Sequence, residues 1–328
     1  MKNPLNHIDI KILSEESLGV RSMATYIETP DLSIILDPGV SLAPRRFGLP
    51  PHPLEFQSVK KAREKIMKFV PKADIVFISH YHLDHYTPPF KSWFEWCNEE
   101  IFEQVYSDKQ ILIKNPDEKI NFRQRRRALT LVNHLEEIQN IDIKVADGRK
   151  YKFLSTDIEI SMPMPHGAKE SKLGWVLLLT IKYRDETVVY APDVQGPISE
   201  ETLQYIISMK PDVAIVGGPP LYLAGNKVKT EDVVQGINNL ELLVENVPLT
   251  VVSHHLLRQL EWREHIKTVF LRASRKGNQV LSAAEFMGTK EEMLEAMRKQ
   301  LYEEKPPSKK FMEWIKNKEQ YRSSPPPL

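Results

Sequence analysis

The stretch Asp74–Tyr86, with the sequence DIVFISHYHLDHY, constrains the fold and chemistry of this chain more than any other. Its first part, Asp74–Ser79, is a short apolar run with β-branched residues, which predicts a buried strand. The run is followed within six positions by four candidate ligands, His80, His82, Asp84 and His85. Imidazole nitrogens and carboxylate oxygens are the donors that zinc, iron and similar divalent metals prefer. The stretch therefore predicts a metal-binding loop at a strand end, able to supply two ligands to each of two metals.

The composition is that of an ordinary globular protein. The 328 residues, 41% hydrophobic and 27% charged, suffice for one large domain or two of ordinary size. The net charge of +1 gives no global electrostatic reason to expect nucleic acid or an anionic membrane as partner. Nucleic acid is therefore an allowed but not a favoured partner, and the oligomeric state stays open.

The cysteine content and the N-terminus bear on the compartment. Cys97 is the one cysteine, so an intramolecular disulfide is impossible, which fits a reducing cytoplasm. The N-terminal residues MKNPLNHIDIKIL lack the apolar core of a signal peptide. No apolar run approaches the ~18 residues of a membrane span. We therefore expect a cytoplasmic protein with no membrane partner.

Periodicity predicts strands and helices that alternate along much of the chain. The predicted strands are Ile8–Leu13, Val20–Thr29, Ser33–Leu36, Asp74–Ser79, Ile111–Ile113, Ile143–Val145, Tyr151–Leu154, Asp157–Met162, Trp175–Tyr183, Thr187–Tyr190, Asp212–Val216 and Leu249–Ser253. The predicted helices are Glu55–Phe69, Asn121–Glu137, Glu200–Ser208, a helix N-capped by Thr230 through Glu245, Glu261–Ser274, Lys290–Glu304 and Lys309–Lys318. Aromatic residues in 90–96 also recur at helical spacing.

A pattern of ligands at strand ends connects distant parts of the chain. Five predicted strands each end at a potential ligand: Asp37, the cluster at His80, His166, Asp193, and the pair His254 and His255. Ligands at the same end of neighbouring strands converge on one edge of a sheet, where loops on a rigid scaffold form catalytic sites. Strand-rich blocks before and after about Pro165 are compatible with two packed sheets.

These motifs resemble the metallo-β-lactamase superfamily. His80–His85 fits its HxHxDH signature, and Asp37, this loop, His166, Asp193 and His254 match its successive motifs in order, between about Ile8 and Leu271. The resemblance implies a four-layer αββα sandwich with a dinuclear site at one edge and a helical insertion after the HxHxDH loop. Within the superfamily the chain is most similar to a mainly archaeal branch of predicted metal-dependent hydrolases.

We accordingly predict three segments. Residues 1–305 would form the metallo-β-lactamase-like domain, within which residues 86–140 are a mainly helical insertion. Residues 306–328 would form a C-terminal helix and a proline-rich tail.

The resemblance also divides the ligands between two metals. The first metal would be held by His80, His82 and His166, and the second by Asp84, His85 and His254. Asp193 would bridge the two, and Asp37 would accept a hydrogen bond near the histidine cluster and orient it. His255 is the alternative to His254, which is favoured as the first residue after its strand, by analogy with the tRNA-processing endonuclease branch.

Two departures separate this ligand set from other branches. It contains no cysteine, unlike the antibiotic-hydrolysing branch, and it keeps histidine at position 82, where the diiron flavoprotein branch has glutamate. Both point to the general hydrolase or nuclease type of site.

The implied function is that of a metal-dependent hydrolase with two divalent ions, zinc in the first place, with iron or manganese as alternatives. A metal-bridged water, its pKa lowered from ~15.7 toward ~7, would attack an ester, thioester, lactone or phosphodiester as hydroxide. The predicted catalytic residues are Asp37, Asp84 and His255, the last as a candidate proton donor. The alternatives are a mononuclear iron oxygenase acting on persulfides, a nucleic-acid phosphodiesterase and a non-catalytic scaffold.

Substrate choice would depend on loops around the site, in residues 43–53, 86–140 and 217–227. Tyr222 in the last of these is either a substrate contact or part of a plain turn. The arginine cluster between Arg123 and Arg127 is interpreted as a solvated helix face, with a phosphate-binding patch as the alternative. The aromatic residues Trp93 and Trp96 are interpreted as part of the core.

Overall fold

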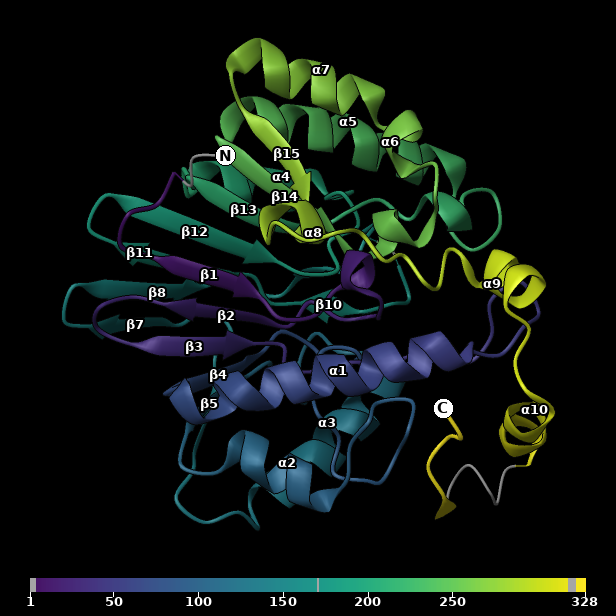
Figure 1. Ribbon diagram of the computed structural model, residues 1–328. Coiled ribbons are helices and arrows are strands. Elements are labelled where there is room, and N and C mark those ends of the chain that lie inside the picture. The colour runs from purple at the N-terminus through teal and green to yellow at the C-terminus, as the bar shows by residue number, and fades with distance from the viewer. Residues whose placement is uncertain (1–3, 170, 318–322) are drawn as a thin grey trace.

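The computed structural model describes residues 4–169, 171–317 and 323–328, and it contains two β-sheets that pack face to face with helices outside them (Figure 1). The first sheet has the strand order β1 (Asp9–Ile12), β2 (Thr25–Glu28), β3 (Ser33–Leu36), β4 (Ile75–Ile78), β5 (Gln110–Ile113) and β6 (Asp142–Val145). The second has the order β15 (Gln279–Ser282), β14 (Leu249–Ser253), β13 (Val213–Gly217), β12 (Glu186–Ala191), β11 (Leu179–Tyr183), β8 (Thr156–Ile160) and β7 (Lys150–Phe153). A separate short pair consists of β9 (Met164–Pro165) and β10 (Trp175–Val176).

Helices cover the outer faces of the two sheets. The first sheet packs against α1 (Pro53–Phe69), α2 (Glu99–Tyr106) and α3 (Phe122–Leu135), and α10 (Lys309–Lys316) packs on α1, where Phe311 and Trp314 contact Phe56. The second packs against α4 (Glu200–Ser208), α5 (Thr230–Asn246), α6 (Trp262–His265) and α7 (Lys267–Lys276). The short helices α8 (Ala283–Phe286) and α9 (Arg298–Glu304) follow β15. None of the described helices, of which α1 and α5 are 17 residues each, combines the length and apolarity that a bilayer crossing requires.

Three apolar cores hold these layers together. The core between the sheets combines residues such as Leu36 and Phe77 of the first sheet with Ile181 and Tyr190 of the second. The two outer cores lie between each sheet and its helices. Strands such as β4 and β13 are buried on both faces, which explains why their sequences are continuous apolar runs. The predicted αββα sandwich is therefore confirmed.

Strand direction brings the loops of the site to one edge. β3 and β4 run parallel in the first sheet, and β12, β13 and β14 run parallel in the second. Because parallel neighbours end at the same edge of a sheet, the residues that follow these strands meet there.

Residues 86–140, predicted to be a mainly helical insertion, contain α2 and α3 and also β5. β5 pairs with β4 on one side and β6 on the other, so this segment contributes a strand to the first sheet. In residues 306–328, α10 ends at Lys316, and Lys318, the last residue of the predicted helix, lies outside the described residues.

Several local predictions are wrong. The aromatic residues around Trp93 form turns closed by a bridge between Ser92 and Cys97, and not a helix, although Trp93 and Trp96 do pack against the outer core of the first sheet. The N-cap of α5 is Lys229, whose side chain makes no capping hydrogen bond. The helix predicted over 261–274 is divided into α6 and α7, and α9 covers only the end of the one predicted over 290–304. β15 was not predicted.

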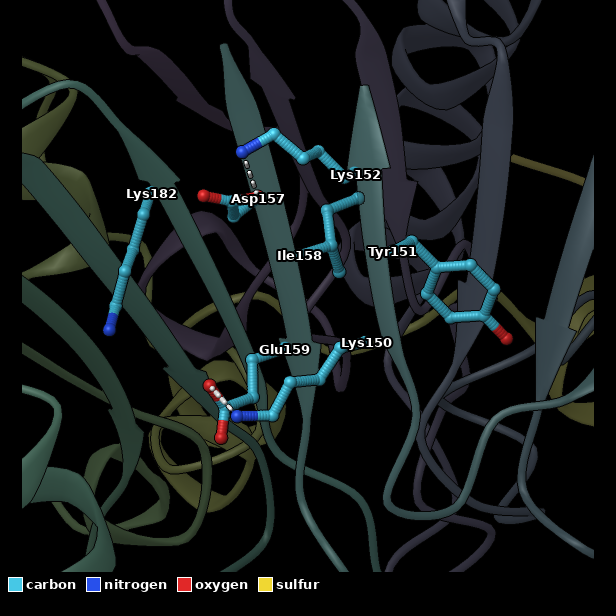
Figure 2. A pocket seen from close by; sticks show the side chains of 7 residues that line it. All are labelled: Lys150, Tyr151, Lys152, Asp157, Ile158, Glu159 and Lys182. Atoms are coloured by element: carbon cyan, nitrogen blue, oxygen red, sulfur yellow. Dashed lines mark ion pairs between the residues drawn. The ribbon is translucent and has the colours of Figure 1, made fainter. Parts of the chain in front are cut away.

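Charged side chains line the outward face of the second sheet near its β7 edge (Figure 2), where Lys150 and Lys152 are each 72% exposed. Cross-strand ion pairs join Lys150 to Glu159 at 3.0 Å and Lys152 to Asp157 at 3.6 Å, and Lys182 extends from β11 beside them. These side chains line a shallow hollow of about 300 Å³. Lysines on an edge strand discourage pairing with another chain, so we interpret this face as a protected sheet edge and not as the functional site.

Candidate metal centre

All nine residues that the sequence predicts for the site lie together in four overlapping groups of potential ligands. Within each group the ligand atoms are no more than 4.8 Å apart, and the groups comprise Asp37, His80, His82, Asp84, His85, His166, Asp193, His254 and His255. They come from the ends of β3 and β4 in one sheet, β12 and β14 in the other, and β9. The side chains of His82, Asp84 and His255 are 26%, 15% and 10% exposed, so they form the open side of an otherwise buried centre.

The backbone turns sharply where the chain leaves three of these strands. Asp37, Asp193 and His254 have φ angles of 45°, 51° and 60°, in the left-handed region. Aspartate and histidine are among the side chains that tolerate this region better, and such positions recur at functional sites. Gly39 permits a close approach of two backbone segments, because a Cβ atom there would lie 2.3 Å from the backbone nitrogen of Tyr86.

The first group of ligands combines three histidines with one carboxylate. His80 Nε2 lies 3.0 Å from His82 Nδ1 and 3.1 Å from Asp193 Oδ2. His166 Nε2 lies 3.0 Å from the same Asp193 oxygen. Burial lowers the pKa of His80 and of His82, so both imidazoles are neutral near pH 7, as metal ligands must be.

The second group is formed by Asp84, His85 and His254. His254 Nε2 lies 3.6 Å from Asp84 Oδ2 and 2.9 Å from Asp193 Oδ1. Burial opposes ionisation of Asp84, but His85 and His254 outweigh it and lower the pKa of this carboxyl. Asp84 is therefore a carboxylate at every physiological pH.

Asp193 lies between the two groups, and its two oxygens face different ones. Oδ2 is near the histidines of the first group, and it is also 3.3 Å from His85 Nε2. Oδ1 faces His254 and His255, at 2.9 Å and 3.2 Å. Burial would raise the pKa of Asp193, but His254 and His166 dominate and hold it well below its usual value. Asp193 therefore contacts histidines of both groups.

Asp37 fixes the orientation of two ligands without belonging to the open centre. Its Oδ2 atom accepts a hydrogen bond from His85 Nδ1 at 2.7 Å, which leaves the lone pair of His85 on Nε2. Oδ2 also accepts the Ser79 hydroxyl at 2.6 Å, so the Ser79 oxygen can only accept from His80 Nδ1, at 2.9 Å. Both histidines therefore present an unprotonated Nε2 to the centre when they are neutral.

Glu16 accepts a hydrogen bond from Nδ1 of His254, as Asp37 does from Nδ1 of His85. The sequence analysis did not identify Glu16. A Glu16 oxygen lies 3.0 Å from His254 Nδ1, which therefore carries the proton, while a second missed residue, Arg258, binds Glu16 at 2.7 Å. Burial works against a charged His254, but Asp193 and Glu16 raise its pKa to about 9. A metal ion at Nε2 would take the place of the second proton. Glu16 follows the predicted strand Ile8–Leu13, so the strand-end rule was the signal that could have found it.

Arg258 contacts both His254 and His255: its Nη2 atom lies 3.2 Å from His254 Nδ1 and 2.9 Å from His254 Nε2, so the two rings differ in their other partners. His255 Nδ1 lies 3.2 Å from Arg258 Nη1 and 3.2 Å from the Tyr222 hydroxyl. Because a guanidinium can only donate, Nδ1 is the acceptor and the proton of neutral His255 is on Nε2, which lies 3.2 Å from Asp193 Oδ1 without forming a hydrogen bond to it. Burial and Arg258 together lower the pKa of His255 well below its usual value, so the ring is neutral. This tautomer suits a hydrogen-bond donor and not a metal ligand.

The residues present fit divalent metal binding. His85 Nε2 and Asp193 Oδ1 are buried polar atoms without a hydrogen-bond partner among the described residues. Each group combines imidazole nitrogens with carboxylate oxygen, the donor set of zinc and of several other divalent metals.

Other predicted features lie around this centre. Arg125 pairs with Asp117 on the exposed face of α3, whereas Arg126 and Arg127 line a hollow of about 260 Å³ together with Leu83. Gln124, a further residue that the sequence did not indicate, accepts the Tyr81 backbone N–H and packs its amide nitrogen 3.4 Å from His82.

Comparison with known proteins agrees with this description. A family model for the beta-lactamase superfamily domain matches residues 20–241, more than half of the chain. The chain therefore belongs to the beta-lactamase superfamily.

Closer relatives are named UPF0282 proteins. One from Pyrobaculum calidifontis is 43% identical over 298 residues, which are 90% of this chain and 96% of that protein. Another, from Methanopyrus kandleri, is 42% identical over 289 residues, 88% of this chain and 97% of that protein. These archaeal relatives confirm the branch that the resemblance indicated. The solved metallo-beta-lactamase fold protein YhfI from Bacillus subtilis aligns with 84% of this chain and 95% of its own, at 13% identity and a TM-score of 0.49.

Proposed function

We propose that this chain is a hydrolase that uses two divalent metal ions, held by His80, His82 and His166 on one side and by Asp84, His85 and His254 on the other. The observation that supports this most directly is the position of Asp193, whose two oxygens face the two groups at 2.9–3.3 Å. When bound, such metals lower the pKa of water and neutralise charge on a substrate oxygen. The substrate would be an ester, thioester, lactone or phosphodiester.

The protein's own groups have separate tasks in this proposal. Asp37 and Glu16 hold the ligating histidines in one tautomer and orientation, so the centre needs little reorganisation. His255, on the open side, donates its Nε2 proton as a hydrogen bond to a substrate oxygen. The sequence predicted that His255 transfers a proton. Because the ring is neutral and neutral imidazole is a weak acid, we propose that His255 instead acts as a hydrogen-bond donor.

One observation favours phosphodiesters among these substrate classes. Arg126 and Arg127 line the hollow behind Leu83, which lies between the ligands His82 and Asp84 in the chain. No carboxylate of the described residues forms an ion pair with either arginine. Guanidinium groups fit phosphate oxygens bidentately, so this hollow could accept a phosphate-bearing part of a substrate.

The test is metal-dependent turnover by the purified chain. The protein is stripped with a chelator, reloaded with zinc or manganese, and assayed with bis-p-nitrophenyl phosphate, a lactone and a glutathione thioester. We expect turnover of at least one substrate, dependent on metal and lost in H82A. H134A is the matched control, because His134 is an exposed histidine of α3 whose Nδ1 contacts only the Thr130 carbonyl, at 2.8 Å.

The same preparation separates the alternatives. One iron per chain, with oxygen uptake on a persulfide, would replace the hydrolase by the oxygenase. Unchanged metal content in H82A, together with no turnover, would favour a scaffold.

A further inference from the structure

Arg21, Arg46 and Arg258 form a cluster behind His254 and His255. Within the part of the chain that the structure describes, two of these arginines are paired with a carboxylate and the third, Arg46, is not. Arg21 binds Glu295 through two contacts of 2.6 Å, and Arg258 binds Glu16 at 2.7 Å and 2.9 Å. Arg46 lies close enough to Glu295 and to both other arginines for their charges to affect the pKa of its guanidinium. Among the described residues, however, no carboxylate lies within ion-pair distance of Arg46.

The guanidinium of Arg46 is held between two aromatic rings. Its central carbon lies 4.3 Å from the ring centroid of Tyr222 and 4.6 Å from that of Phe47. Nη2 donates to the Arg258 carbonyl at 2.9 Å, while Nε is buried and has no hydrogen-bond partner. Burial lowers the pKa of this guanidinium, the sign that its charge is poorly solvated. A poorly solvated cation without an ion-pair partner is costly, and an anion beside the guanidinium would offset that cost.

A continuous stack of side chains links Arg46 to the metal centre. The Tyr222 ring lies nearly parallel to that of His255, at 22° with centroids 6.1 Å apart, and its hydroxyl contacts His255 Nδ1. The opposite nitrogen of His255 is the one that faces Asp193 at 3.2 Å. Arg46 is therefore two side chains away from Asp193, on the side of the centre where His255 is partly exposed. Arg46 and Tyr222 also belong to two of the loops from which substrate choice is expected.

We propose, on the basis of the hydrolase function above, that Arg46 binds a negatively charged group of the substrate, a carboxylate or a phosphate, and so selects anionic substrates. The two rings cover the faces of the guanidinium, so its N–H edge is what remains for a ligand. Nε is shielded from solvent and Nη2 already donates to the Arg258 carbonyl, so the remaining Nη hydrogens are the donors that match two oxygens of a carboxylate or phosphate. Tyr222 would thereby orient both the anion site and His255.

Two esters that differ only in a terminal carboxylate test this selectivity. They are p-nitrophenyl hexanoate and mono-p-nitrophenyl adipate, assayed with the zinc-loaded full chain. We expect wild type to prefer the adipate ester in kcat/KM, and R46Q to lose ~10–100-fold of that preference, as for a lost charge-assisted hydrogen bond. R46K should lose part of it, because lysine keeps the charge without the planar fork.

The matched control is R45Q, the same substitution one residue earlier. Arg45 is exposed, and its side chain donates only to the Gly48 carbonyl at 3.2 Å. We expect R45Q to keep the wild-type preference and both variants to unfold at similar temperatures. An equal preference in wild type, R46Q and R45Q would overturn the proposal.

A second measurement does not need hydrolysis. If wild type turns over neither ester, the hydrolase proposal fails for this substrate class, but the anion site can still be tested on the metal-free protein. Calorimetric titration with inorganic phosphate and with adipate should give at least ~10-fold weaker binding to R46Q than to wild type or R45Q. Equal affinities in all three would exclude an anion site at Arg46, whatever the enzyme's activity.

Discussion

Replacing Asp37 with asparagine tests how the protein orients its metal ligands. Oδ2 of this residue accepts three hydrogen bonds, from Ser79 Oγ at 2.6 Å, His85 Nδ1 at 2.7 Å and the Tyr190 hydroxyl at 2.9 Å. Oδ1 accepts the backbone N–H of Ser79 at 2.7 Å. An asparagine amide has one acceptor oxygen, so in either orientation its NH₂ group faces a donor. D37N therefore loses the charge that holds His85 and leaves at least one buried donor unpaired.

Two magnitudes follow from these contacts. We expect the zinc affinity of D37N to fall ~10–100-fold, or about 1.4–2.7 kcal/mol, the usual effect of losing a partner that orients a metal-bound histidine. The unpaired buried donor should lower the free energy of unfolding by a further ~1–3 kcal/mol. Competition with a chromophoric chelator measures the affinity, and urea unfolding of the metal-free protein measures the stability.

E55Q is the matched control for D37N. Glu55 is 1% exposed and Arg298 binds its carboxylate through contacts of 2.7 Å and 2.8 Å, outside the ligand groups. We expect E55Q to be destabilised while its zinc affinity stays at the wild-type value. A folded D37N protein that binds zinc as tightly as wild type would refute the reasoning about Asp37.

Three further predictions concern the second metal group and its backbone. H254A should retain about one metal per chain, whereas H255A should retain two and lose turnover; metal analysis showing the reverse would exchange their roles. In the metal-free protein His254 should contribute on the order of 3 kcal/mol of stability that is lost between about pH 6.5 and 9, because its pKa rises from 6.5 to about 9 on folding; His85, whose pKa is lowered by burial but raised further by Asp37 and Asp193, well above its usual value, adds to this loss. That stabilisation is complete below the pKa of the unfolded state and disappears as the pH passes the pKa of the folded state. In urea unfolding, the free energy of unfolding of the zinc-loaded protein should show no such dependence on pH. The same dependence in both forms would count against His254 as a ligand. G39A should cost ~1–3 kcal/mol, because its Cβ would lie 2.3 Å from the Tyr86 nitrogen and 2.5 Å from that of His85; wild-type stability would contradict the close approach.

The sequence was sufficient to predict the fold and the ligand candidates because both depend on local patterns. Buried strands are continuous apolar runs, and their ends are marked by Asp37, His80, His166, Asp193 and His254. Strand direction then brings these ends together, so a one-dimensional rule predicts a three-dimensional cluster. The order of the motifs supplied the rest, through the resemblance to a known superfamily.

What escaped prediction depends on contacts between distant segments. Glu16 and Arg258 are separated by 242 positions, and no local pattern pairs them. The choice between His254 and His255 also depends on tautomers, which Glu16 and Arg258 set in opposite ways. Around Trp93, the helical spacing of aromatic residues did not correspond to a helix. These residues lie in turns, and tertiary packing buries their rings without a helix.

Anomalous scattering from crystals of the zinc-loaded chain tests the central claim most directly. The account predicts two peaks at the zinc edge, one surrounded by His80, His82 and His166 and the other by Asp84, His85 and His254, with Asp193 contacting both. A single peak, or two peaks of which neither is bound by Asp193, would contradict the account.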